Sequence, residues 1–202
     1  MFVQVIRGTI NDADHARAAL DRWVEELGAG AVGWLGTTAG VSGDGGFIAL
    51  ARFESEEAAR RNSDRPEQGQ WWQETSALFA GEPSFRDSSD VVLDIVGDPS
   101  EAGFVQVIQG RGNDPERARE LMGQDSDVWA AFRPDILGSV AVLHDGGAYT
   151  MVLYFTSEAD AREGERKQPP PELEAQMKEL DALSVGEPEF LDIRQPWLYA
   201  PR

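Results

Sequence analysis

The segment FVQVIRGTINDADHARAAL, residues 2–20, resembles a second segment 102 residues later, FVQVIQGRGNDPERARELM, residues 104–122. Ten of these nineteen positions are identical without a gap. The same spacing continues further along the chain, where Phe53-Glu54-Ser55-Glu56 matches Phe155-Thr156-Ser157-Glu158. A period of about a hundred residues indicates duplicated domains, because solenoid repeats are much shorter. The sequence therefore predicts one folding unit written twice in tandem.

The ends of the two copies define the expected domains. Gly81–Phe85 matches Gly186–Phe190 at a spacing of 105, so the second copy carries three extra residues, which we place near Pro169–Pro171. The polar Pro/Gly stretch GDPSE at 97–101 suits a linker. We expect a first repeat over residues 1–97, a linker over 98–103 and a second repeat over 104–202.

Each copy alternates strand and helix signals in the same order. The expected elements of the first copy are a strand at Phe2–Gly8, a helix capped by Asn11-Asp12, strands at Val32–Val41 and Phe47–Phe53, a helix capped by Ser55 and interrupted at Pro66, a helical piece at Glu67–Phe79, and a strand from Ser84 to about Val96. This β-α-β-β-α-β order predicts an α+β unit with an antiparallel sheet and helices on one face. Such a sheet leaves its other face bare, so we expect the two copies to pack these faces together.

Composition excludes several classes of function. The chain of 202 residues has no cysteine, which excludes disulfides and thiolate chemistry. Its net charge of −18 would repel nucleic acids and anionic lipids. The acidic residues either solvate the helices or adapt the protein to high salt. We expect a cytoplasmic protein with no membrane span, no metal and no cofactor, which exists as a monomer or homodimer.

A segment of the first copy resembles a known family. Ala51–Asn62 reads ARFESEEAARRN and is followed by Gln70-Trp71-Trp72. This pattern resembles the dimeric α/β-barrel superfamily and, within it, the antibiotic-biosynthesis monooxygenase group. The resemblance implies two tandem ferredoxin-like repeats, with antiparallel sheets packed face to face as an intramolecular dimeric α/β barrel. Some members oxidise polycyclic aromatic compounds with oxygen but without metal or flavin, others degrade haem, and many have no known activity. The haem degraders need a histidine after the aromatic residue, and none follows Trp72 in this copy.

Polar residues on the strands are the first candidates for a site. On a two-residue period, Gln4 faces the expected cavity if Val3 and Val5 face the helices, and Gln106 repeats it. Alternatively, the two glutamines satisfy each other or nearby backbone groups. Arg52, with Tyr154 as its counterpart in the second copy, is a candidate hydrogen-bond donor toward the cavity. Alternatively, Arg52 extends into solvent from the strand end.

The helical candidates occur in one copy only. By the resemblance, Asn62 is the polar residue and Trp71 or Trp72 the aromatic residue of the site, whereas the second copy has Gly164, Gln176 and Met177 at these positions. Trp34 is a further candidate for the cavity wall. The alternative is that Asn62 ends its helix and the tryptophans are core. The asymmetry favours a single ligand site in the first copy, because packing alone would tend to act on both copies alike.

Two functions follow from these candidates. One is a cofactor-independent monooxygenase that binds an aromatic small molecule, with Asn62, Arg52 and Gln4 as catalytic groups. Trp34, Trp71, Trp72, Gln106 and Tyr154 would then contact the substrate. The other is a non-catalytic binding or structural protein whose cavity holds a hydrophobic metabolite or is filled by side chains.

Overall fold

The computed structural model describes residues 1–201, which form two compact units. Unit 1 contains Met1–Ser89 and the C-terminal segment from Gln195, and unit 2 contains Asp90–Arg194. Each unit is built on one five-stranded antiparallel sheet. Within residues 1–201, no helix has the length and apolar character needed to cross a membrane.

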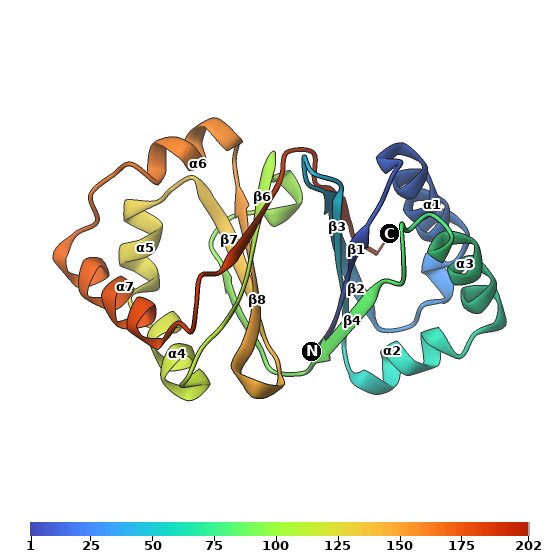
Figure 1. The fold of residues 1–202 in the computed structure, drawn as a ribbon, viewed down its shortest axis with the longest axis horizontal. Helices are drawn as coiled ribbons and strands as arrows, with labels where there is room; N and C mark the ends of the chain where they lie inside the picture. Colours follow the sequence, from blue (N-terminus) through green and yellow to red (C-terminus); the bar gives the residue numbers. More distant parts are fainter. Residues whose placement is uncertain (202) are drawn as a thin grey trace. The chain divides into compact units, whose positions relative to one another are not determined.

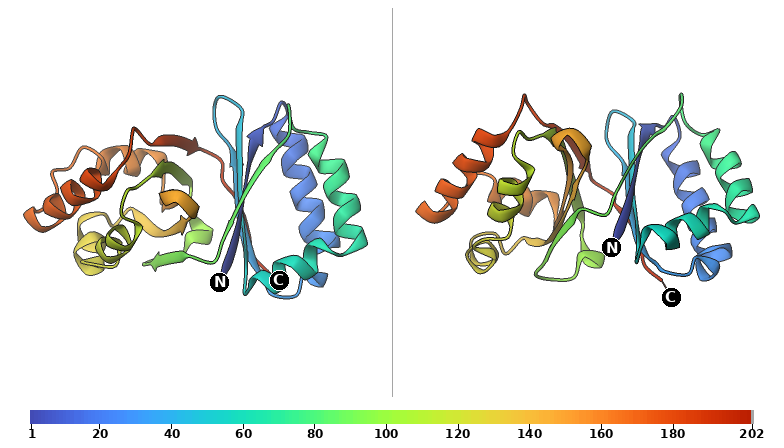
Figure 2. Two further views of the ribbon diagram at one scale, coloured as in Figure 1. Left: turned by 60° about the horizontal axis from the view of Figure 1, so that its bottom comes forward. Right: turned by 90° about the horizontal axis from the view of Figure 1, so that it is seen from below.

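Unit 1 has helices on one face of its sheet (Figure 1). Its strands, in the order β10-β2-β3-β1-β4, are β1 (Phe2–Thr9), β2 (Trp34–Val41), β3 (Gly46–Phe53), β4 (Ser84–Ser88) and β10 (Trp197–Tyr199). Its helices are α1 (Ala13–Glu26), α2 (Glu56–Ser63) and α3 (Pro66–Ser76), with a short 3₁₀ turn at Gly28–Gly30. Helices α1 and α3 lie side by side against the sheet (Figure 2).

Unit 2 repeats this plan. Its strands, in the order β5-β7-β8-β6-β9, are β5 (Val91–Ile95), β6 (Phe104–Arg111), β7 (Ile136–Leu143), β8 (Ala148–Phe155) and β9 (Glu189–Ile193). Its helices are α4 (Pro115–Met122), α5 (Ser126–Phe132), α6 (Glu158–Gly164) and α7 (Pro171–Leu183), and 3₁₀ turns cover Pro99–Glu101 and Asp145–Gly147. The α+β class and the duplicated ferredoxin-like units are thus confirmed.

The fifth strand of each unit comes from the other repeat. The expected single strand from Ser84 to about Val96 is wrong, because the chain breaks between β4 and β5. Strand β4 pairs with β1 in unit 1, whereas β5 pairs with β7 in unit 2. At the end of the second repeat, β10 pairs with β2 of unit 1. The compact units therefore differ from the repeat boundaries at 97 and 104, and the two open sheets share no strand pairing that would close them into one barrel.

Local signals place the helix starts where the sequence predicts them. Asp12 accepts a hydrogen bond from the backbone N of His15 at the start of α1, and Ser55 accepts one from Ala58 at the start of α2. Pro66 opens α3, and its counterpart in the second repeat opens α7, since proline suits the first helical position.

The alternation of β1 decides which side chains face the helices. Phe2 belongs to the buried cluster that contains Trp23 of α1 and alanines of α2, and Ile6 packs against the cluster that contains Ala16 of α1. Gln4 lies between Phe2 and Ile6 on this helix-facing side. Val3 and Val5 therefore point to the opposite face of the sheet, which reverses the orientation expected from the sequence.

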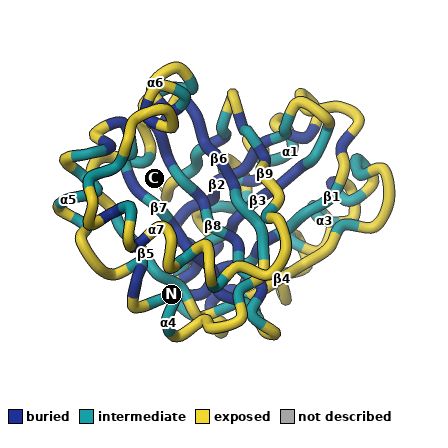
Figure 3. The backbone as a smooth tube through the Cα atoms, turned by 60° about the vertical axis from the view of Figure 1, so that its left-hand side comes forward, coloured by how far each residue is buried: buried dark blue, intermediate teal, exposed yellow. Residues whose placement is uncertain are grey.

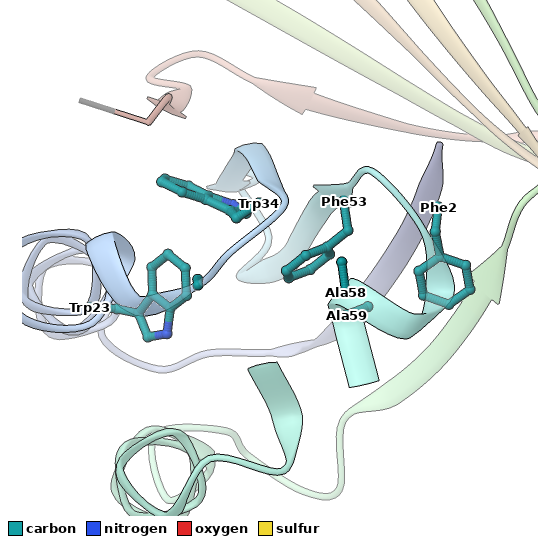
Figure 4. Close-up of a cluster of buried hydrophobic side chains, with 7 residues drawn as sticks. Phe2, Trp23, Trp34, Phe53, Ala58 and Ala59 are labelled. Carbon is teal, nitrogen blue, oxygen red and sulfur yellow. The ribbon is translucent and has the colours of Figure 1, made fainter. Parts of the chain in front are cut away.

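Buried residues are concentrated in strands such as β2 and β3, as the colouring of Figure 3 shows. In unit 1, one hydrophobic cluster between sheet and helices contains Phe2, Trp23, Trp34 and Phe53, together with Ala58 and Ala59 of α2 (Figure 4). Their burial removes large apolar areas from water, which is the main contribution to the stability of this layer.

Candidate functional site

Four tryptophans gather on the helix-facing side of unit 1. The ring centroids of Trp23 and Trp34 lie 4.9 Å apart in an edge-to-face arrangement (Figure 4). Trp71 of α3 lies 6.3 Å from Trp23, and Trp72 lies 6.1 Å from Trp71. We call these four residues the tryptophan cluster. Trp23 and Trp34 are buried, whereas Trp71 and Trp72 keep part of their surface accessible.

Trp34 reaches the helix-facing side through an irregularity in β2. The register of β2 on β3 shifts between Trp34 and Gly36, so that Trp34 and Thr37 share one face. Gly36 adopts φ +133°, where a side chain would meet the carbonyl oxygen of Tyr199. The Trp34 indole then donates to Thr37 Oγ1 at 3.0 Å. Trp34 is therefore a packed core residue that forms the floor of the cluster.

The other indole N–H groups also bind within the protein. Trp23 Nε1 donates to Gln68 Oε1 at 2.5 Å, and Trp71 Nε1 donates to the backbone oxygen of Ala19 at 2.9 Å. These bonds fix α3 against α1 and hold the rings in place. The N–H groups of Trp23, Trp34 and Trp71 are thus used within the protein, and of these three rings only that of Trp71 keeps part of its surface accessible.

Asn62 is buried at the end of α2 and binds an arginine. Its Oδ1 accepts a hydrogen bond from Arg65 Nη1 at 3.0 Å, and the same Nη1 donates to the backbone oxygen of Leu27 at 3.1 Å. Arg65 also pairs with Glu67 at 2.9 Å. Asn62 therefore holds a guanidinium over the C-terminal end of α1, and its Nδ2 amide group is the donor that it retains for another partner.

The two glutamines bind aspartates rather than each other. Gln4 Nε2 donates to Asp87 Oδ2 at 3.2 Å, and Gln106 Nε2 donates to Asp192 Oδ1 at 3.0 Å. Both aspartates lie directly across on the neighbouring strand. Gln106 is helix-facing because Phe104, two residues earlier, packs with Ala161 of α6. Each glutamine is thus on the helix-facing side of its own unit.

Arg52 and Tyr154 lie on the opposite face of their sheets. Arg52 precedes Phe53 in β3, and Phe53 is helix-facing. Tyr154 precedes Phe155 in β8 in the same way, and it is 2% exposed. The expectation that Arg52 shares a site with the helical candidates does not fit this geometry, because the sheet backbone of unit 1 separates it from the tryptophan cluster, and Tyr154 belongs to unit 2.

Unit 2 fills the equivalent site with its own side chains. Gly164 stands at the position of Asn62, and the guanidinium of Arg133 occupies the space that a side chain at 164 would take. Arg133 binds Asp135 through three bonds, at 2.7, 2.9 and 3.3 Å, and lies over the ring of Phe155 at 5.6 Å. Both charged residues are 8% exposed. This buried pair closes the site in unit 2.

A matched pair of hydrogen bonds confirms which helical positions correspond. Trp71 donates to the carbonyl of Ala19, and Gln176 Nε2 donates to the carbonyl of Leu121 at 2.5 Å. Ala19 and Leu121 are 102 residues apart, whereas Trp71 and Gln176 are 105 apart, as the two repeat spacings require. Gln176 also accepts from the indole of Trp129 at 2.6 Å. The amide of Gln176 thus donates to the preceding helix in unit 2, as the indole of Trp71 does in unit 1.

Comparison with known proteins rests on structure. No family model and no curated protein matches the sequence. Two structures named "putative monooxygenase", from Lactobacillus acidophilus NCFM and Fusobacterium nucleatum subsp. nucleatum ATCC 25586, match with TM-scores of 0.72 and 0.74 at 12% and 8% identity. Both matches cover 98% of this chain, and 98% and 94% of theirs. An anthrone oxidase-like protein matches with a TM-score of 0.60 at 13% identity, over 98% of this chain and 93% of its own. The chain has the tandem ferredoxin-like fold of monooxygenase-like proteins.

Two residues of unit 1 were not predicted from the sequence. Tyr199 of β10 donates from Oη to Asp21 Oδ1 at 2.7 Å, and burial followed by this bond raises the pKa of the phenol. Thr75 of α3 is 7% exposed, and its Oγ1 has no hydrogen-bond partner among residues 1–201. Tyr199 belongs to the second repeat, and it reaches unit 1 only because β10 pairs with β2. Thr75 could have been found from its spacing, since it follows Trp71 by one helical turn.

Residues 1–201 contain no group of three or more His, Asp or Glu side chains placed to hold a metal ion. The polar candidates of unit 1, Asn62, Gln4 and Thr75, carry amides and a hydroxyl, which bind neutral or anionic oxygen atoms. Gln4, Ile6 and Ala51, which point toward the helices, all keep partial exposure. The helices therefore leave part of this sheet face exposed.

Proposed function

We propose that the chain binds an aromatic, hydrophobic small molecule on the helix-facing side of unit 1 and oxygenates it without a cofactor. The observation that carries the proposal is the contrast between the units. Unit 1 presents Asn62, Trp71 and Trp72, while unit 2 closes the same place with the buried Arg133–Asp135 pair. The similarity of fold to monooxygenase-like structures supports the choice of reaction.

The groups on this face suit an electron-rich ring that becomes an anion. Trp71 and Trp72 supply accessible ring surface, against which a polycyclic substrate stacks. The amide hydrogens of Asn62 and Gln4 are the donors for the negative oxygen that develops when the substrate loses a proton to solvent water. The anion then gives electrons to oxygen. For anthrone the balance is one anthrone and one O₂ to one anthraquinone and one water.

The test is oxygen uptake with anthrone, a probe suggested by the anthrone oxidase-like structure. Asn62→Asp keeps an oxygen acceptor for Arg65 but replaces the amide donor with a negative charge. We expect this variant to lose about a hundredfold in rate, the usual effect of removing one oxyanion donor. Trp72→Ala is expected to weaken binding of anthrone. Met177→Ala, the change at the matching position of unit 2, is the control and should leave the rate unchanged.

A second candidate is binding without catalysis. It is favoured by one specific observation, namely that three indole N–H groups and the Asn62 oxygen are all used within the protein. In that case the cluster is a rigid apolar platform for a metabolite. Quenching of tryptophan fluorescence by anthrone without oxygen uptake would favour this candidate over the monooxygenase.

A further inference from the structure

We propose that Thr75 is the polar anchor of the ligand in unit 1, through a hydrogen bond between its hydroxyl and a neutral hydroxyl or carbonyl oxygen on an aromatic ring. This inference rests on the proposed ligand site and adds the polar group that a ligand must carry. No role of Thr75 in the packing of unit 1 requires its hydroxyl.

The hydroxyl of Thr75 is an unusual group in this structure. Thr75 is 7% exposed, and Oγ1 finds no hydrogen-bond partner among the described residues. Buried polar side-chain atoms are paired in the large majority of cases, because an unpaired one keeps the cost of leaving water without a compensating bond. A helical threonine often bonds to the carbonyl four residues before it, and this one does not.

The position of Thr75 directs it to the same face as the tryptophans. Thr75 follows Trp71 by four residues and Trp72 by three, so the three side chains line one face of α3. This helix lies over β4, because the rings of Trp72 and Phe85 are 5.3 Å apart between centroids, and Phe85 pairs with Ile6 of β1. The half-buried residues Gln4 and Ile6 belong to β1. Thr75 thus lies in the layer where the sheet face keeps partial exposure.

The second repeat shows what packing alone selects at this place. The spacing of 105, which the Trp71 and Gln176 bonds confirm, pairs Thr75 with Leu180. In unit 2, a leucine packs at this helix position, and Arg133 fills the space beside Gly164. Unit 1 thus has a hydroxyl where unit 2 has an apolar side chain, and only unit 2 places a guanidinium at the matching position of the preceding helix. A hydroxyl both donates and accepts, so it suits a phenol or a ring carbonyl rather than a full charge.

Calorimetric titration with two probes of similar shape tests the anchor. 1-Naphthol carries the hydroxyl, and 1-methylnaphthalene carries a methyl group in its place. We expect Thr75→Val to weaken 1-naphthol about tenfold, the equivalent of one hydrogen bond. The same change should leave 1-methylnaphthalene unchanged or tighter. Thr75→Ser, the control, keeps the hydroxyl and should keep the preference for 1-naphthol.

Stability provides the second readout. Because valine has the shape of threonine without the unpaired hydroxyl, Thr75→Val should raise the unfolding temperature of the ligand-free protein. A lower unfolding temperature would show that the hydroxyl is satisfied within the fold and would overturn the anchor. Equal binding of both probes by wild type and Thr75→Val also overturns the anchor, while the ligand site stands. Wild-type protein that binds neither probe contradicts the ligand site itself, and the anchor falls with it.

Discussion

The guanidinium of Arg133 lies where the side chain of residue 164 would stand, so that only glycine fits there. The matching position of unit 1 holds Asn62, which is buried and bonded to Arg65. The two units therefore have different side chains at equivalent positions, and each arrangement excludes the other. An arginine with its aspartate fills it in unit 2, and a neutral amide borders it in unit 1.

Gly164→Ala should destabilise the protein by about 2 kcal/mol, since the added methyl group forces the buried Arg133–Asp135 pair to move. Gly69→Ala is the matched control, because this helical glycine has open space around its Cβ position. There we expect a gain of about 0.5–1 kcal/mol from helix propensity. Urea unfolding of both variants measures the difference, and equal effects of the two changes would contradict the overlap with Arg133.

Trp71→Phe should cost about 1 kcal/mol of stability beyond the small loss of ring area, because it removes the donor to the Ala19 carbonyl while keeping an aromatic ring. Gln176→Met should cost more, about 2–3 kcal/mol. It removes the donor to Leu121 and leaves the half-buried indole of Trp129 without its acceptor. Urea midpoints at neutral pH give the order, and a larger loss from Trp71→Phe would contradict it.

Asp160 gives a prediction for pH. Hydrogen bonds from the side chains of Ser157 and then Thr156 lower the pKa of its carboxyl group in the folded state. Its contribution is therefore fully present above the unfolded-state pKa of about 3.9 and is lost as the pH falls through the lower folded-state value. Asp160→Ala, which copies Ala58 of unit 1, should be less stable than wild type at pH 7. The gap should narrow below about pH 4. A gap that stays constant from pH 7 to pH 3 would show that the carboxylate charge contributes nothing.

The duplication and most elements of each unit could be predicted from sequence, because they depend on local signals. The caps at Asp12 and Ser55 and the break at Pro66 act within a few residues of their position. The exchange of β5 and β10 between the units could not be predicted, because the alternation of apolar residues does not indicate which sheet a strand joins. The polar run from Ser88 to Asp90 was the one signal that the expected fourth strand ends early.

The candidate site could be predicted only in part. The contrast between Asn62 and Gly164 was visible in the sequence, but the residue that fills the place in unit 2 was not. Arg133 comes from a stretch with no match in the first repeat. The orientation of Gln4 was predicted wrongly because the two-residue period places Val3 and Gln4 on opposite faces without indicating which face points toward the helices. Contacts of Phe2 and Ile6 with the helices decide between the two orientations.

The central claim is that a single aromatic ligand binds on the helix-facing side of unit 1, and calorimetric titration of 1-naphthol tests it most directly. We expect one molecule per chain, with binding that is weakened by Trp72→Ala and kept by Arg52→Gln and Tyr154→Phe, whose side chains lie on the opposite sheet faces. Two molecules per chain, or binding that depends on Arg52 or Tyr154 but not on Trp72, would contradict the account.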